Sequence, residues 1–180
     1  LENGKQAKKL FKKVFAKDNH KLPYSAKTDS DEVYILRKTL SGDIVENMFK
    51  AGKECGCTLN DVFVAAYLRA CYRLTQCDKN ESMTISCALD LRRYIKDIDS
   101  IGYTNHTNFM PCSVSHMGAD MTDTIRELSA NTKALKADQF NGLYGIPLLN
   151  VGYSTMIYLQ AEIVVKANYY NADLQVTNIG

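Results

Sequence analysis

The sequence predicts an α/β (α+β) fold in which helices pack on one face of a mixed sheet. Three observations predict this class: apolar residues at helical spacing over 58–75, strand-like alternation over 83–91, and a succession of strand and helix patterns along the chain. The 180 residues, 46% of them hydrophobic and 23% charged, suffice for one domain or two small lobes. This composition excludes the collagen-like, coiled-coil and disordered classes.

The N-terminal region predicts a basic amphipathic helix and a linker. Over 5–17, apolar residues recur every three or four positions among lysines. Such a helix can contact an acidic partner, or it can expose a solvated lysine face over a packed apolar stripe. Residues 18–31 are polar and contain Pro23, which indicates a linker. We therefore divide the chain into residues 1–31 and a folded lobe over 32–180.

A strand and a helix are expected next. Residues 32–40 alternate well enough to predict a strand. Ser41 is suited to cap a helix over 41–53, with Asp43 in its first turn. The glycines between 52 and 56 indicate where that helix ends.

The strongest pattern is the helix over 58–75. Thr58 and Asp61 have the spacing of a capping box. The apolar stripe behind them predicts a face that packs closely against a sheet or another helix. Its members are Val62, Phe63, Ala66, Tyr67, Ala70, Cys71 and Leu74. We expect Tyr67 and Ala70 to be among the most buried of them.

The rest of the chain predicts three strands and at least one further helix. The strands are expected over 83–91, 109–116 and 173–179, and the helix over 121–140; residues 151–168 could form another helix. One face of the first strand carries Ile85, Cys87 and Leu89. The inner face of the 121–140 helix carries Ile125, Leu128, Thr132 and Leu135.

Several classes of protein and site are not expected. No segment reaches the roughly 20 apolar residues of a membrane-spanning helix. Six cysteines are too few for a disulfide scaffold, and no secretory signal is visible, so we expect reduced thiols and a cytoplasmic protein. Cys55 and Cys57 lack the further ligands of a tetrahedral zinc site, so no metal is expected. A net charge of +2 gives no indication of a nucleic-acid partner.

Four segments, taken in order, resemble a known superfamily. They are TLNDVFVAAYLRA (58–70), ISCALDLRRY (85–94), GYTNHTNFMP (102–111) and DLQVTNIG (173–180). Together they resemble the second half of the condensation domains and alcohol acetyltransferases, which are chloramphenicol-acetyltransferase-like acyltransferases. The resemblance covers residues 30–180 and implies a lobe of that fold.

The resemblance implies acyl transfer from a thioester to an alcohol or amine. The co-substrate would be an acyl-CoA or a phosphopantetheine-linked acyl group on a carrier protein, and no bound cofactor is implied. In the family, the second His of a His-His-x-x-x-Asp-Gly motif is the general base. This chain has no adjacent His pair, so we expect it to be the C-terminal half of such a domain, inactive without its missing N-terminal lobe.

The resemblance also assigns roles to a few residues. Arg92 matches the Arg of the family's Asp-Leu-Arg segment, which implies an ion pair with the motif Asp of the other lobe and a structural role for Asp90. Thr177 and Asn178 match a strand end beside the substrate tunnel, where they could bond the substrate carbonyl or the oxyanion. Asn105 or Asn108 could match a loop asparagine. For Arg92, the alternative is an exposed side chain at a strand end, and for Thr177 and Asn178 it is plain strand termination.

His116 and Asp120 form a further His-x-x-x-Asp pattern, in which the carboxylate could hold the imidazole ring. However, Ser115 stands where the motif has its first His, and Met121 stands where it has Gly. The pattern also falls in the wrong half of the family layout. We therefore assign no catalytic residue and expect His116 to be a surface or strand-end histidine.

Two functions follow from these observations. The first is the C-terminal lobe of a condensation-type acyltransferase. The alternative is a non-catalytic interaction or docking module of the same fold, whose basic helix contacts an acidic acyl-carrier protein or the phosphates of coenzyme A. A lobe that exposes the apolar surface of a missing partner should also associate with itself, so we expect a homo-oligomer.

Overall fold

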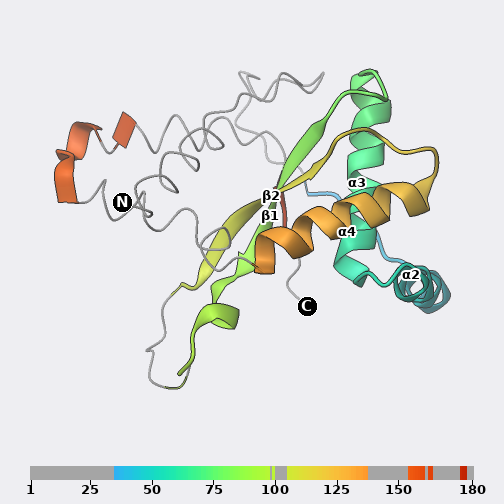
Figure 1. Ribbon diagram of the computed structural model, residues 1–180, viewed down its shortest axis with the longest axis horizontal. Helices are drawn as coiled ribbons and strands as arrows, with labels where there is room; N and C mark the ends of the chain where they lie inside the picture. The colour runs from blue at the N-terminus through green and yellow to red at the C-terminus, as the bar shows by residue number, and fades with distance from the viewer. Residues whose placement is uncertain are drawn as a thin grey trace. The chain divides into compact units, whose positions relative to one another are not determined.

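The computed structural model describes residues 35–97, 99, 105–137, 154–160, 162–163 and 175–177, and it has a mixed α/β fold, as the sequence predicts. Its elements are α2 (Gly42–Glu54), α3 (Leu59–Thr75), β1 (Met83–Asp90), the 3₁₀ helix η1 (Leu91–Tyr94), β2 (Thr107–Val114), α4 (Met121–Ala137) and β3 (Gln175–Val176) (Figure 1). Among these residues, no helix is long and apolar enough to cross a membrane.

Parts of the predicted architecture lie outside the described residues. These are the basic helix over 5–17, the linker over 18–31, residues 32–34 of the predicted 32–40 strand, the last three residues of the 121–140 helix, and residues 173–174 and 178–179 of the last predicted strand. Of the possible helix over 151–168, only short helical stretches at 154–155, 158–160 and 162–163 are described.

The chain forms two compact units. One comprises Leu1–Asn19, Ile85–Pro111 and Lys133–Gly180, and the other comprises His20–Thr84 and Cys112–Thr132. The first unit therefore holds most of β1 and β2, together with η1 and β3. The second unit holds α2, α3 and most of α4.

The sheet has three strands in the order β2-β1-β3. β1 and β3 are parallel, with Ser86 opposite Gln175 and Cys87 opposite Val176. β2 runs antiparallel to β1: the hydroxyls of Thr84 and Ser113 lie 2.8 Å apart near one end, and the N–H of Leu91 donates to the carbonyl of His106 at 2.8 Å at the other. Buried residues alternate with less buried ones along β1, and Ile85, Cys87 and Leu89 are buried, as predicted.

In the second unit, α3 and α4 cross and α2 lies against α3 (Figure 1). The capping box at the start of α3 is confirmed, because Thr58 and Asp61 each accept from the other's backbone N–H. The core of the unit includes Leu68 and Leu128, which are both fully buried. On α4, the predicted inner residues Ile125, Leu128 and Thr132 are buried, and Leu135 is half-buried.

Asp61 is a buried carboxylate that joins the two helices. Its side chain is 3% exposed and accepts from the Thr58 N–H at 2.9 Å and the Thr58 hydroxyl at 2.8 Å. It also accepts from the hydroxyls of Ser129 at 3.2 Å and Thr132 at 3.4 Å on α4. The carboxylate therefore serves as an N-terminal cap and as an interhelical contact at once.

The prediction of which face of α3 is buried is wrong, because the observed buried face is rotated about the helix axis from the predicted one. Tyr67 is only half-buried and Ala70 is exposed, whereas Ala65 and Leu68 are fully buried. The reason is Asp61, for which the sequence pattern predicted a capping role but no contact with another helix. Because its carboxylate bonds to α4, the face that carries Asp61, Ala65 and Leu68 is turned inward.

The segment before α2 also differs from its prediction. Residues 35–40 are irregular rather than a strand, and Ile35 and Leu36 are 90% and 99% exposed. Strand-forming residues need a neighbouring strand to pair with, and the described residues 35–40 belong to no sheet. Ser41 is the N-cap of α2, as predicted, but its side chain makes no capping hydrogen bond.

We expect Leu68→Ala to destabilise the protein far more than Leu74→Ala on the same helix. Leu68 is fully buried, so its truncation leaves a cavity and should cost about 2–5 kcal/mol. Leu74 is 55% exposed, and its truncation should change the free energy of unfolding by no more than about 0.5 kcal/mol. Urea denaturation of the two variants measures the difference, and equal losses would contradict this packing.

Replacing Asp61 with Ala should also destabilise the fold. The substitution leaves the Thr58 N–H and the Ser129 hydroxyl without their acceptor, and an unpaired buried group costs about 1–3 kcal/mol. Asp43→Ala is the matched control, because Asp43 is an exposed acidic residue in the first turn of α2. If both variants unfold at the same urea concentration, Asp61 does not join the helices.

Candidate functional site

A hollow of about 230 Å³ lies where β1 passes into η1, opposite the start of β2. It is lined by Asp90, Arg92, Asn105, His106 and Thr107, all in one compact unit, and we call it the polar hollow. The resemblance assigns roles to Asp90 and Arg92 and offers Asn105 as one of two candidates. The structure brings these three residues together.

The local sequence explains how this turn forms. Leu91 is buried and anchors the chain, while its N–H donates to the carbonyl of His106. Asp90 then caps η1, because its Oδ1 accepts from the N–H of Arg92 at 3.0 Å. The apolar residue faces inward and the two charged residues on either side of it face solvent.

Arg92 pairs with Asp90 of the same chain through two of its three guanidinium nitrogens. Nε lies 2.8 and 3.0 Å from the two carboxylate oxygens, and Nη2 lies 2.8 Å from Oδ2. The side-chain hydrogen bond from Arg92 is the main reason why the pKa of Asp90 lies below its ordinary value, and the same bond raises the pKa of Arg92. Asp90 therefore already compensates the charge of Arg92, and an ion pair with a second lobe stays a prediction.

The two candidate loop asparagines differ in position. Asn105 lines the polar hollow, and its Oδ1 accepts from the N–H of Thr107 at 2.9 Å. Asn108 does not line it; its Oδ1 accepts from the N–H of Phe109, and its Nδ2 is buried without a hydrogen-bond partner. Of the two, Asn105 is the one that belongs to the site.

Thr177 directly follows β3 and is not among the residues that line the polar hollow. Continuing the register of β1 and β3 by one residue would bring it opposite Ala88. Thr177 is exposed. Asn178 lies outside the described residues.

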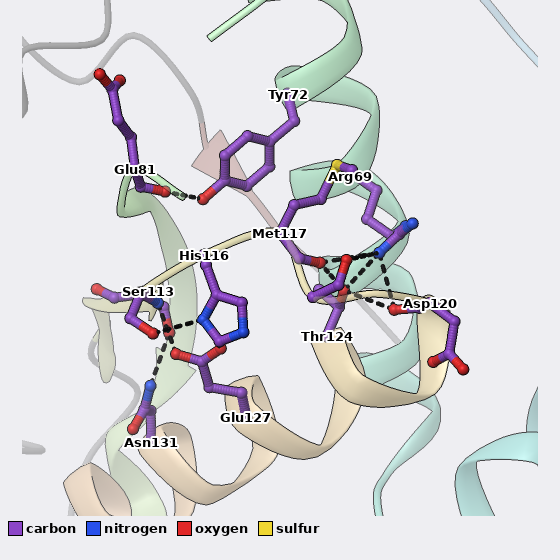
Figure 2. A network of polar contacts seen from close by, with 12 residues as sticks. Arg69, Tyr72, Glu81, Ser113, His116, Met117, Asp120, Thr124, Glu127 and Asn131 are labelled. Carbon is purple, nitrogen blue, oxygen red and sulfur yellow. Dashed lines mark hydrogen bonds and ion pairs between the residues drawn. The ribbon is translucent and has the colours of Figure 1, made fainter. Parts of the chain in front are cut away.

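The ring of His116 contacts Glu127 rather than Asp120 (Figure 2). His116 Nδ1 lies 3.4 Å from a Glu127 carboxylate oxygen and 2.8 Å from the Ser115 hydroxyl. The Asp120 carboxylate instead accepts from the N–H of Asp123 at 2.9 Å, at the start of α4. The structure thus does not bring the two members of the His-x-x-x-Asp pattern together.

Ser115, His116 and Glu127 do not form a nucleophilic relay either. In such a relay the serine and the acid bond to different ring nitrogens, so that a proton can pass through the imidazole. Here both contacts involve Nδ1. Glu127 also accepts from the backbone N–H of Ser115 at 2.6 Å, which is a structural contact between the end of β2 and α4.

Arg69 fixes the turn that leads into α4, and the sequence patterns gave no sign of it. Its Nη1 lies 2.8 Å from the carbonyls of Met117 and Asp120 and 2.8 Å from the Thr124 hydroxyl (Figure 2). Gly118 in this turn has a φ of +75°, which favours glycine, and a Cβ there would lie 3.0 Å from that of Asp123. The segment after His116 is therefore a tightly held turn.

The polar hollow contains two further residues, His106 and Thr107, that sequence reasoning did not select. The sequence could have indicated them because they directly follow Asn105, and residues next to a lining residue often line the same site.

The cysteines do not assemble a metal site among the described residues. All six are free thiols, and no group of three or more potential ligand side chains is found in the part of the chain that the structure describes. Burial raises the pKa of the Cys71 thiol, and so does the neighbouring Cys77. A protonated thiol is a poor ligand and a poor nucleophile.

Comparison with family models, with curated proteins and with solved structures finds no match for this chain. The acyltransferase resemblance stays a prediction from the four sequence segments.

We expect Arg92→Ala to raise the pKa of the Asp90 carboxyl group toward its ordinary value of about 3.9. The folded-state pKa is depressed, so the ion pair stabilises the fold above the unfolded-state pKa, and this stabilisation is lost as the pH falls through the folded-state pKa. NMR titration of the Asp90 carboxyl carbon measures the shift. Arg93→Ala is the control: Arg93 lies in the same turn, over the ring of Tyr94, and an equal effect of its removal would contradict the specific pair.

Proposed function

We propose that this chain is the C-terminal lobe of a condensation-type acyltransferase. The parent enzyme would transfer an acyl group from a coenzyme A or carrier-protein thioester to an alcohol or amine. The lobe would supply one wall of the substrate tunnel, and the general base would come from the His-His-x-x-x-Asp-Gly motif of a second lobe.

The observation that carries this proposal is the assembly of the polar hollow. Residues from two of the four resembling segments, Asp90 with Arg92 and Asn105 with Thr107, line one hollow. A third segment contains β3, which is parallel to β1, and its Thr177 directly follows that strand. Because the carboxyl ends of neighbouring parallel strands lie at one sheet edge, this arrangement supports a substrate wall formed by the three segments.

In this proposal the wall orients a substrate and stabilises charge. Thr177, Thr107 and Asn105 offer hydroxyl and amide donors, which suit a thioester carbonyl or the oxyanion that forms from it. The Asp90–Arg92 pair keeps the turn in shape. Transfer would be direct, with the acceptor's proton passing to the base of the second lobe.

The docking module remains the second candidate because of the segment before α2. Ile35 and Leu36 are almost completely exposed, and apolar side chains in such positions favour contact with another chain. The DNA sequence upstream of the codon for Leu1 separates the two candidates. An in-frame His-His-x-x-x-Asp-Gly segment supports the enzyme, and its absence from the complete reading frame would leave only the docking module.

For the complete protein, we expect Arg92→Ala to lower kcat/KM for acetyl transfer from acetyl-CoA to small alcohols by about tenfold or more, which corresponds to a loss of about 1.4 kcal/mol. The substitution leaves Asp90 unpaired in the substrate wall. His116→Ala should leave turnover unchanged, since its ring bonds to Ser115 and Glu127 and His116 does not line the hollow. Arg93→Ala is the charge-matched control.

The chain of residues 1–180 alone should show no turnover above background. General-base catalysis by a positioned His contributes about 10²–10⁴ in rate, and the proposal places that His in the other lobe. Turnover by this chain that disappears in His106→Ala would make His106 the base and overturn the two-lobe assignment. Loss of turnover in His116→Ala of the complete protein would overturn it as well.

A further inference from the structure

We propose that the polar hollow binds the oxyanion group of a small molecule, a phosphate or a carboxylate, through Arg92, Asn105 and Thr107. This inference goes beyond the proposed function and does not depend on it. It rests on which hydrogen-bonding groups of the hollow are already used and which are open.

Arg92 presents one open edge of a guanidinium group that is held in a fixed orientation. Asp90 engages Nε and Nη2, while Nη1 and its two N–H groups are not part of that contact. The side chain is 58% exposed, so this edge is accessible. A planar guanidinium matches the geometry of carboxylate and phosphate oxygens. A guanidinium that is already oriented by a neighbouring carboxylate loses little conformational entropy on binding a ligand.

Asp90, in contrast, has little capacity left for a cation. A carboxylate offers about four lone-pair positions. The Asp90 oxygens already receive three N–H groups of Arg92: the backbone N–H, the Nε–H shared between the two oxygens, and one N–H of Nη2. Asp90 is the only acidic residue among the described residues that line the hollow, and its neighbour already uses most of its acceptor positions, which disfavours a cationic ligand.

The other two residues add donors. The Oδ1 of Asn105 is used by the N–H of Thr107, which orients the amide and leaves the two Nδ2 donors. The Thr107 side chain adds a hydroxyl on the same lining. A hollow of about 230 Å³ holds a phosphate or carboxylate with part of the organic group attached to it.

The experiment titrates the chain with sodium phosphate and, separately, with sodium acetate, at constant ionic strength kept with sodium chloride. Binding is followed by NMR through the Nε–H signal of Arg92 and the amide signals of Asn105 and Thr107. We expect saturable shifts confined to the hollow. The phosphate and acetate arms decide which oxyanion it prefers. Shifts that do not saturate, or that spread over all basic residues, would overturn the proposal.

Three variants test the assignment of donors. Arg92→Ala should weaken binding of the preferred anion by about tenfold or more, because a charge-assisted hydrogen bond is lost. Arg92→Lys keeps the positive charge but loses the planar pair of guanidinium N–H donors, so it should also weaken binding. This variant tests the role of Arg92 if Arg92→Ala does not fold. Arg93→Ala removes an equal charge from the same turn and should change affinity less than twofold. Equal losses in Arg92→Ala and Arg93→Ala would mean unspecific attraction and overturn the site.

Asp90→Ala tests whether Asp90 orients the Arg92 side chain or only contributes a negative charge to the hollow. If Asp90 only contributed negative charge, its removal would strengthen anion binding. If it holds Arg92 in place, affinity should fall, and the Nε–H signal of Arg92 should move toward that of a free arginine. Stronger anion binding in Asp90→Ala would refute the positioning role.

Discussion

The buried carboxylate of Asp61 is the contact on which the packing of the second unit depends. It accepts from the start of α3 and from two hydroxyls of α4, so it fixes where α3 begins and which of its faces meets α4. A buried acceptor is tolerated only when its hydrogen bonds are made, and here they come from three residues on two sides. Leu68 and Leu128 can then lie in the interior, because the rotation of α3 is already determined.

Arg69 provides the second constraint in this unit, at the turn from β2 into α4. Its Nη1 bonds to the carbonyls of Met117 and Asp120, which precede the helix, and so ties α3 to the turn. The hydroxyl of Thr124 bonds to the same Met117 carbonyl. These contacts explain why the His-x-x-x-Asp spacing does not bring the two side chains together: Asp120 caps the start of the helix, Gly118 makes the turn, and His116 lies at the strand end beside Glu127.

Local patterns predicted the fold well where a single element decides its own structure. The Thr58–Asp61 capping box, the alternation along β1 and the inner face of α4 around Leu128 follow from spacing alone. Prediction failed where the structure of an element depends on residues far away in the sequence. The rotation of α3 depends on the hydroxyls of Ser129 and Thr132. Residues 35–40 lack the strand pairing that their composition favours. Sequence reasoning singled out Asp90, Arg92 and Asn105 but did not predict that they line one hollow, because the antiparallel register that brings Asn105 and its neighbours to the end of β1 is a tertiary property.

The end of β1 shows how a strand can support a polar site without a buried charge. Leu91 points inward and its N–H is bonded to the carbonyl of His106, so the backbone between β1 and β2 is fixed from the apolar side. The flanking Asp90 and Arg92 must then face solvent, where they pair with each other at no large desolvation cost. A pair of this kind adds little stability, but it holds one guanidinium edge in a constant direction. A guanidinium held in this way is suited to recognition of a ligand, because it loses little conformational entropy on binding.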